Sequence, residues 1–253
     1  MKQLLLKLYY IGSLSKEETN KNQKLIRDVE WSGILPYLKK GNFLDVGCGA
    51  GYAMQMAKEA GCEVFGIDPN PGGHGVGRIG SGFNVDAKVI EGYAEKIGFE
   101  SKMFDTVYSS HVLEHVNSET ESLQEMSRVM KDEGVLIIGM PTNHILKWKW
   151  LAYALFTTHH KIINLLFGRF IKVGKTKFRN IFIPESHSIP TKTILYDMKY
   201  YTIENWTNIV SKEFKIIETV LPAYYPFPEY FQFFKLHKSK TKSSSVFFVC
   251  QKK

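Results

Sequence analysis

Residues 42–52, which read Asn-Phe-Leu-Asp-Val-Gly-Cys-Gly-Ala-Gly-Tyr, constrain the fold more than any other part of the chain. The first half is a short apolar run typical of a buried strand, and the second half places glycine at alternate positions. From Tyr52 small and apolar residues recur at helical spacing as far as Gly61. A strand, a glycine turn and a helix in this order bring backbone N–H groups close to a ligand, because glycine has no Cβ to block the approach. The segment therefore predicts a turn that binds a nucleotide-like ligand.

Two acidic residues accompany this turn. Asp45 lies just before the glycines, and Asp68 closes a second apolar run at residues 64–67. A carboxylate at the tip of a second parallel strand can accept hydrogen bonds from both hydroxyls of a ribose. The three glycines are spaced G-x-G-x-G, which differs from the G-x-G-x-x-G of dinucleotide-binding folds. Together these features resemble the class I S-adenosylmethionine-dependent methyltransferases.

The resemblance implies a fold, a cofactor and a set of binding residues. The fold of that family is an α/β, Rossmann-like, doubly wound sheet of seven strands, mostly parallel with one antiparallel strand. The implied cofactor is S-adenosyl-L-methionine. The implied cofactor-binding residues are Asp45, Gly47, Cys48, Gly49, Gly51, Asp68, Tyr93, Ala94 and Ser110.

The third expected strand, at residues 87–91, leads to a position that departs from the family pattern. The family normally carries an acid where this chain has Tyr93, and that acid holds the adenine amino group. Tyr93 has no carboxylate, so we expect adenine contacts from stacking on its ring and from the backbone of Ala94. Glu95 is an alternative source of the carboxylate.

A second match covers residues 104–141, so the resemblance is nearly continuous from 42 to 141. Residues 104–110 read as a strand, 111–116 as His-Val-Leu-Glu-His-Val, and the following residues as a helix. An Asp-Glu-Gly turn at 132–134 replaces the family's usual Pro-Gly-Gly, and residues 135–139 read as the next strand. These segments resemble the fourth and fifth strands of the family.

His111 and His115 are the candidate catalytic bases, because they follow the fourth strand, where the transferred methyl group should lie. A hydroxyl acceptor generally needs a base, and an unperturbed imidazole titrates near neutrality. The Val-Leu-Glu-His segment is common in the family whatever the substrate. An alternative is therefore that one of the two histidines only caps or orients the following helix.

The same residues spell H-x-x-E-H, a zinc-peptidase string whose ligands must lie within a helix. His111 directly follows a strand instead, so the sequence favours no metal site. Some small-RNA and quinone methyltransferases bind a metal through Glu-x-x-Glu-His. A metal site in this chain therefore stays open as an alternative, with the ligands His111, Glu114, His115 and His187.

Charge is distributed unevenly along the chain. The formal net charge is +8, but residues 1–142 carry 15 Lys+Arg against 19 Asp+Glu, a net of −4. Residues 143–253 carry 18 against 6, a net of +12. A polarised charge of this kind indicates an anionic partner for the C-terminal part.

Residues 143–183 combine two apolar, aromatic-rich runs with eight Lys+Arg and no Asp or Glu. They lie where the family inserts substrate-binding elements, so we expect a helical lid insert. Neither run is long enough to cross a bilayer, and lying in its interface is the furthest the segment could go. Two interpretations remain: the lid only packs on the domain, or it meets an anionic membrane peripherally.

Four parts are expected along the chain. Residues 1–40 form an N-terminal segment and a helix that Pro36 divides. Residues 41–142 form the cofactor-binding core, 143–200 the basic aromatic lid, and 201–253 a helix and two last strands that complete the sheet. One side of the N-terminal helix is expected to be apolar through Leu25, Val29, Ile34, Leu35 and Leu38.

Three classes of function follow from these observations. The favoured one is methyl transfer to a small-molecule or lipid-linked acceptor, such as a sugar hydroxyl. A methyltransferase for RNA or another nucleic acid is the second, suggested by the basic C-terminal part. Against this second class, the chain lacks the Asn/Asp-Pro-Pro-Tyr tetrapeptide of amino-directed base methylases, since residues 109–112 read Ser-Ser-His-Val. The third is a non-catalytic cofactor-binding protein, which the intact acid, glycine and acid set disfavours.

The cysteines and the N-terminal residues indicate the cellular compartment of the protein. The three cysteines have no pair or metal spacing, and the N-terminal apolar run is too short for a signal peptide. These features predict a cytoplasmic protein, with peripheral attachment to the inner membrane face as an extension of that prediction. The sequence does not determine an oligomeric state.

Overall fold

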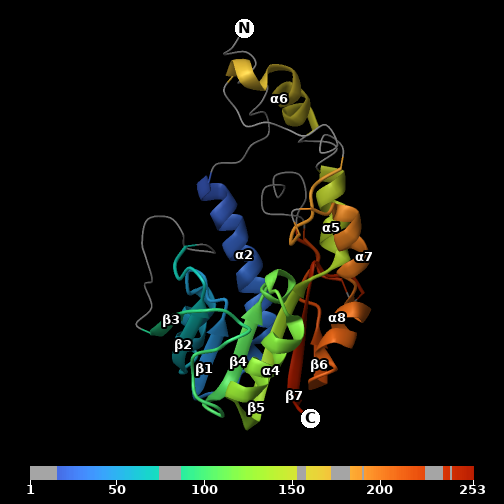
Figure 1. Cartoon of the computed structure of the whole chain (residues 1–253). Helices are drawn as coiled ribbons and strands as arrows, with labels where there is room; N and C mark the ends of the chain where they lie inside the picture. Colours follow the sequence, from blue (N-terminus) through green and yellow to red (C-terminus); the bar gives the residue numbers. More distant parts are fainter. Residues whose placement is uncertain are drawn as a thin grey trace.

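The computed structural model describes residues 16–73, 87–152, 158–171, 183–189, 191–225, 236–239 and 241–253. Seven strands in these residues form one sheet in the order β3-β2-β1-β4-β5-β7-β6 (Figure 1). They are β1 (Asn42–Val46), β2 (Glu63–Asp68), β3 (Lys88–Glu91), β4 (Phe104–Ser110), β5 (Met130–Pro141), β6 (Phe214–Val220) and β7 (Ser245–Lys252). Neighbours from β3 to β5 pair in parallel, and β7 runs antiparallel to both β5 and β6. This arrangement confirms the predicted fold class.

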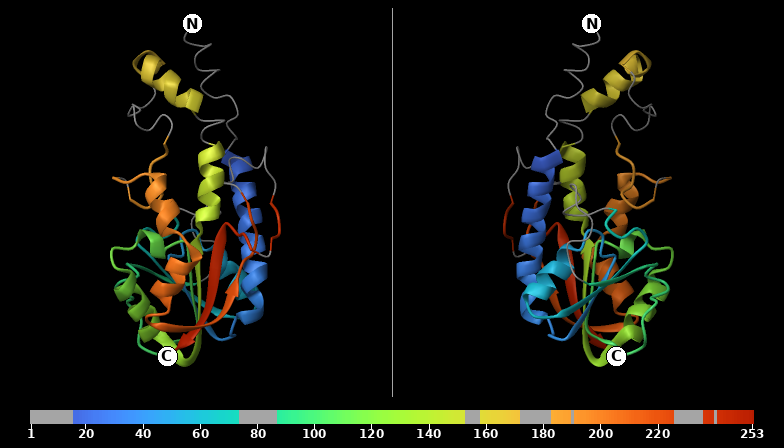
Figure 2. Two further views of the ribbon diagram at one scale, coloured as in Figure 1. Left: turned by 90° about the vertical axis from the view of Figure 1, so that its right-hand side faces the viewer. Right: turned by 90° about the vertical axis from the view of Figure 1, so that its left-hand side faces the viewer.

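Helices cover both faces of the sheet. Figures 1 and 2 show α2 and α3 on one face, with α4 and α8 on the other. The α-helices are α2 (Lys16–Ile34), α3 (Tyr52–Glu59), α4 (Glu119–Val129), α5 (Asn143–Ala152), α6 (Thr158–Ile171), α7 (Ile194–Tyr200) and α8 (Ile203–Val210). Two short 3₁₀ helices cover Leu35–Tyr37 and Leu113–His115.

Two hydrophobic cores lie between these layers. Successive residues of a strand point to opposite faces of the sheet, so each central strand contributes to both cores. On the α2 and α3 face, Phe43 of β1 packs in one cluster with Trp31 and Met54. On the other face, Leu44 packs in one cluster with Met126 of α4. The sheet is therefore covered on both sides, and ligands reach it at its edge.

Helix α2 ends at Ile34, and Pro36 lies in the 3₁₀ helix that follows, as expected. The predicted apolar side of this helix was wrong in part, because Leu25 and Leu35 are 49% and 42% exposed. The face that meets the sheet consists of Ile26, Glu30, Trp31 and Ile34. It includes a charged residue because this part of the helix also borders the site described below.

The predicted turn at residues 132–134 was also wrong. Strand β5 begins at Met130, directly after α4, and includes these residues. Its pairing with β4 shifts there, since Met130 pairs with Phe104 and Val135 with Thr106. The extra residues of β5 form an irregularity in the ladder, which accommodates a polar stretch without ending the strand.

Helices α5 and α6 belong to the predicted insert. Helix α5 begins just beyond β5 and packs against α7. Helix α6 lies farther from the sheet, beyond the carboxyl ends of the parallel strands (Figures 1 and 2). Residues 153–157 and 172–182 of the expected insert lie outside the described residues. Among the described residues, no helix has both the length and the apolar character needed to cross a membrane.

Candidate functional site

A cavity of about 490 Å³ opens at the carboxyl ends of β1, β2 and β4. Its volume is in the range typical of small-molecule sites, and it lies where the order of the sheet reverses, between β1 and β4. Gly51, which precedes α3, is the one predicted site residue that does not line it. The predicted residues that do are Asp45, Gly47, Cys48, Gly49, Asp68, Tyr93, Ala94, Ser110, His111 and His115.

The glycine turn follows β1 and forms one wall of this cavity. Gly47, Gly49 and Gly51 all have positive φ angles, of 79°, 49° and 81°. L-residues with a side chain rarely adopt this conformation. A Cβ on Gly47 would also lie 2.2 Å from Cγ2 of Val112. The turn can therefore approach a ligand with its backbone, as the sequence predicted.

Asp68 holds the glycine turn against the end of β2. Its carboxylate is 1% exposed and accepts hydrogen bonds from the backbone N–H of Gly49 at 2.9 Å and of Asn70 at 2.7 Å. Asp68 also lines the cavity, so it supports the turn and presents acceptor oxygens at the cavity wall.

Asp45 lies at the end of β1 and is 3% exposed. Burial, and secondarily the negative charge of Asp68, raise the pKa of Asp45 to about 8. Both causes disfavour the carboxylate in the free protein. A positively charged ligand in the cavity would favour it, so this end of the site suits a cation.

Tyr93 and Ala94 form the wall after β3. The Tyr93 ring is 62% exposed beside the cavity, which leaves its face available for stacking. Glu95 accepts a hydrogen bond from the backbone N–H of Asn117 at 2.7 Å. Glu95 therefore joins two cavity loops, and its carboxylate is not dedicated to a ligand.

A buried polar cluster, absent from the sequence prediction, lies next to the cavity. Glu30 of α2 is 1% exposed and accepts hydrogen bonds from Tyr225 at 2.5 Å and from Ser245 at 2.6 Å. It also forms an ion pair with Arg27, which lines the cavity. Burial would raise the pKa of Glu30, but Arg27 and His111 hold that pKa well below its usual range.

His111 lies between this cluster and Glu114. Its backbone φ is 57°, and its N–H bonds the carbonyl of Gly139 at 2.9 Å. The imidazole is 18% exposed, with Nε2 3.6 Å from Glu30 and Nδ1 3.6 Å from Glu114. Burial and Arg27 oppose protonation, but the contacts with the two carboxylates prevail and raise the pKa of His111. The imidazole is therefore a stronger proton acceptor, and less of it is neutral at a given pH.

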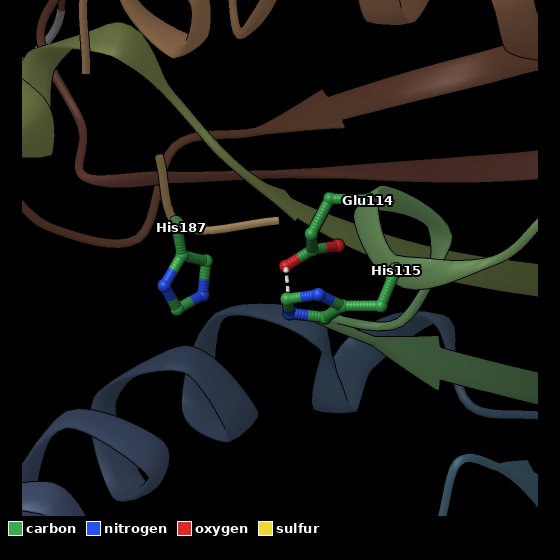
Figure 3. A group of neighbouring side chains, drawn as sticks. All are labelled: Glu114, His115 and His187. Carbon is green, nitrogen blue, oxygen red and sulfur yellow. Dashed lines mark ion pairs between the residues drawn. The ribbon is translucent and has the colours of Figure 1, made fainter. Parts of the chain in front are cut away.

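Glu114 also contacts His115, whose Nε2 lies 3.9 Å from its carboxylate. The His115 side chain is 43% exposed and lines the cavity. The ring of His187, from a segment far along the chain, lies 5.0 Å from the ring of His115 (Figure 3). No helix contains the H-x-x-E-H string, because His111 has a left-handed backbone and only Leu113–His115 is helical.

The missed residues left only weak signals in the sequence. Arg27 and Glu30 are spaced i, i+3 on the same side of a helix as Trp31 and Ile34, a pattern that also fits an exposed ion pair. Tyr225 and Ser245 have no motif at all. Their contacts with Glu30 span about two hundred residues, so only the folded chain reveals them.

The site as a whole fits one kind of ligand. Backbone from the glycine turn, the acid Asp68 and an exposed aromatic ring suit a nucleoside. Asp45 suits a positive charge on the same molecule. His111 and His115 line the same cavity.

Comparison with known proteins agrees with this geometry. Residues 44–138 match the family described as "Methyltransferase domain". The chain is 28% identical over 200 residues to the uncharacterized protein MJ1252 of Methanocaldococcus jannaschii. The aligned region covers 77% of this chain and 71% of MJ1252. The chain is 34% identical over 122 residues to a tRNA U34 carboxymethyltransferase of Saccharophagus degradans, covering 44% of this chain but only 36% of the relative.

A solved structure with the same fold covers nearly all of both chains. It is a SAM-dependent methyltransferase from Thermotoga maritima, with a TM-score of 0.58, 15% identity and 94% of each chain aligned. At that identity the likeness concerns the fold alone.

Proposed function

From the premise that the chain belongs to the class I S-adenosylmethionine-dependent methyltransferases, we propose that it methylates a hydroxyl of a small-molecule or lipid-linked acceptor, such as a sugar. The observation that carries this proposal is the position of His111. It lines the cofactor cavity and has a buried carboxylate on each side. A group that must take a proton from a hydroxyl benefits from such neighbours, because both stabilise the imidazolium that forms.

The cavity fits S-adenosylmethionine, which supplies a methyl group on a positively charged sulfur. We assign Asp68 and the backbone of Gly49 to the ribose end, and the Tyr93 ring with the Ala94 backbone to the adenine. Asp45 faces the cationic part. The protein's remaining task is to hold the two reactants in line and exclude water.

The raised pKa of Asp45, about 8, predicts pH-dependent cofactor binding. Below that pH the free protein holds Asp45 largely protonated, whereas the cationic cofactor favours the carboxylate. Binding should therefore release a proton, and the affinity should rise with pH until about 8, by at most about tenfold per unit, and then level off. Titration calorimetry in two buffers of different ionisation enthalpy measures both quantities. Asp45→Asn should remove the proton release, and a wild-type affinity independent of pH contradicts the prediction.

His111 is a better candidate base than His115. His111 has two carboxylates within 3.6 Å and is mostly buried, whereas His115 has one at 3.9 Å and is 43% exposed. The buried Glu30 cluster fixes the position of one of these carboxylates. We therefore assign proton removal to His111.

The basic insert supports a lipid-linked acceptor at an anionic membrane. It combines eight Lys+Arg and no acid with a set of exposed apolar side chains on α5 and α6. Both helices lie beyond the edge of the sheet where the cavity opens (Figure 2). Each basic residue near an anionic surface contributes about 1 kcal/mol, and apolar side chains can enter the interface. The exposed apolar residues are Trp150, Leu151, Ile162, Leu165, Leu166 and Phe167.

Liposome flotation tests this attachment. The protein should float with phosphatidylglycerol vesicles at low salt, and less at high salt or with phosphatidylcholine, because both charge and apolar area contribute. Leu165→Glu combined with Leu166→Glu should abolish flotation. Ile217→Glu, at a residue 49% exposed on β6, is the matched control and should float like the parent. Equal flotation of all variants, or none of the parent, contradicts the membrane proposal.

RNA is the second candidate acceptor. The net charge of +12 in residues 143–253 and the likeness to a tRNA-modifying enzyme favour it. Incubation with methyl-labelled cofactor and separate lipid and RNA extracts distinguishes the two. Label in the organic phase supports the lipid-linked acceptor, and label in RNA overturns it.

A further inference from the structure

The proposed reaction uses Glu114 only as a neighbour of His111, which does not account for its position beside a second imidazole. Its side chain is fully buried, and neither carboxylate oxygen has a hydrogen-bond partner among the described residues. A buried carboxylate without hydrogen bonds is costly, and the imidazoles at 3.6 and 3.9 Å are the groups that offset this cost here. A metal ion would bond directly to these oxygens, which neither imidazole does.

Two imidazoles face the same space as this carboxylate. One ligand atom each from Glu114, His115 and His187 lie within 4.8 Å of one another. Figure 3 shows the carboxylate and the two rings gathered from two separate parts of the chain. Glu114 and His115 belong to one 3₁₀ helix, and His187 comes from the segment after the insert.

Hydrogen bonds to Asp197 hold the backbone at His187 in place. The carboxylate of Asp197, which is fully buried on α7, accepts hydrogen bonds from the N–H of His187 and from the Ser186 hydroxyl, both at 2.6 Å. The His187 backbone is therefore anchored, which keeps its ring within reach of the Glu114 carboxylate.

We propose that Glu114, His115 and His187 bind a divalent transition-metal ion. Two imidazole nitrogens and one carboxylate oxygen form a ligand set that Zn²⁺ and its neighbours accept, whereas Mg²⁺ and Ca²⁺ prefer oxygen alone. Bonds of about 2.0–2.2 Å require ligand atoms about 3.3 Å apart, so the three groups must close by about 1 Å or more. The exposed rings of His115 and His187 can make that movement.

Three protein ligands would leave such an ion able to take a further ligand, and His115 also lines the cavity. The ion would bind an oxygen of the acceptor, orient it and make its proton easier to remove. This role rests on the proposed function, whereas the binding of the metal does not. His111, which contacts Glu114, would help to hold the carboxylate in position.

The test is a titration of the full chain, freed of metal by chelation, with Co²⁺. We expect one equivalent to bind with a visible absorption spectrum typical of few-coordinate cobalt, and Zn²⁺ to displace it while equimolar Mg²⁺ does not. Glu114→Gln and His187→Ala should each lower the affinity by about a hundredfold or more, since each removes a direct ligand. His187 is exposed, so its variant should fold even if the other does not. His237→Ala, at an exposed histidine elsewhere, is the control.

Two results would overturn the proposal: no stoichiometric uptake, or uptake that both ligand variants leave unchanged. Displacement by Mg²⁺ would overturn the choice of a transition metal. Binding of S-adenosylmethionine to the metal-free protein is measured in parallel by calorimetry. Failure of cofactor binding with intact metal uptake would count against the proposed function and not against the metal centre.

Discussion

Replacement of His111 by alanine should lower turnover by a factor of about 10²–10⁴, the usual contribution of a positioned base. Cofactor affinity should change little, because the proposed cofactor contacts are assigned to the glycine turn, Asp68, Tyr93 and Ala94. The measurement is the initial rate of methyl-label transfer to the acceptor at saturating cofactor, with the cofactor dissociation constant from calorimetry.

His237→Ala serves as the control for removing an imidazole from the same protein, and it should keep the parent rate. His111 is also part of a buried cluster with Glu30, so the melting temperature of each variant must be compared with that of the parent. A folded His111→Ala variant with near-parent turnover would make His111 a structural residue and remove the base from the proposed reaction.

Replacement of Asp68 by alanine should weaken cofactor binding by about one to two powers of ten. A hydrogen bond to a charged group contributes about 1.5–3 kcal/mol, which corresponds to that change in affinity. Asp68 also holds the N–H groups of Gly49 and Asn70, so its loss loosens the turn as well as the ribose contact. Asp68→Asn keeps one acceptor oxygen and should have an intermediate affinity.

Glu91→Ala is the matched control for Asp68. Glu91 pairs with Asp68 in register at the end of the neighbouring strand, is exposed, and does not line the cavity. Its replacement should leave the dissociation constant unchanged. Parent-like binding by Asp68→Ala would reject the assignment of the ribose end.

Local sequence determined the cofactor half of this site. The elements here are short and continuous, and side-chain periodicity reports which residues are buried. Glycine at alternate positions predicted a turn between strand and helix, and the structure has such a turn, in which Gly47 and Gly49 adopt positive φ. Parallel strands end at one edge of a sheet, so the acids at the ends of β1 and β2 had to lie near each other. For these reasons Asp45, Asp68 and the glycine turn could be predicted together.

The helical spacing of apolar residues was less informative for α2, because more than one orientation of the helix on the sheet fits that spacing. Leucines at helical spacing predicted an apolar side of α2, but Leu25 and Leu35 face solvent while Glu30 is buried. An ion pair with Arg27 and hydrogen bonds from Tyr225 and Ser245 compensate the buried charge, and α2 alone contains only one of these partners. Which face meets the sheet therefore depended on residues far away in sequence.

The surroundings of His111 were decided by tertiary structure. His111 could be placed after β4 from the sequence, but its two carboxylate neighbours come from α2 and from the 3₁₀ helix. His187 lies more than seventy residues beyond Glu114 in the sequence. Asp197 anchors the backbone of His187 where its ring comes near Glu114. Contacts of this kind have no periodicity, since they depend on how distant elements pack. The sequence alone therefore predicted the cofactor and the turn expected to bind it, and packing decided which charged groups surround His111.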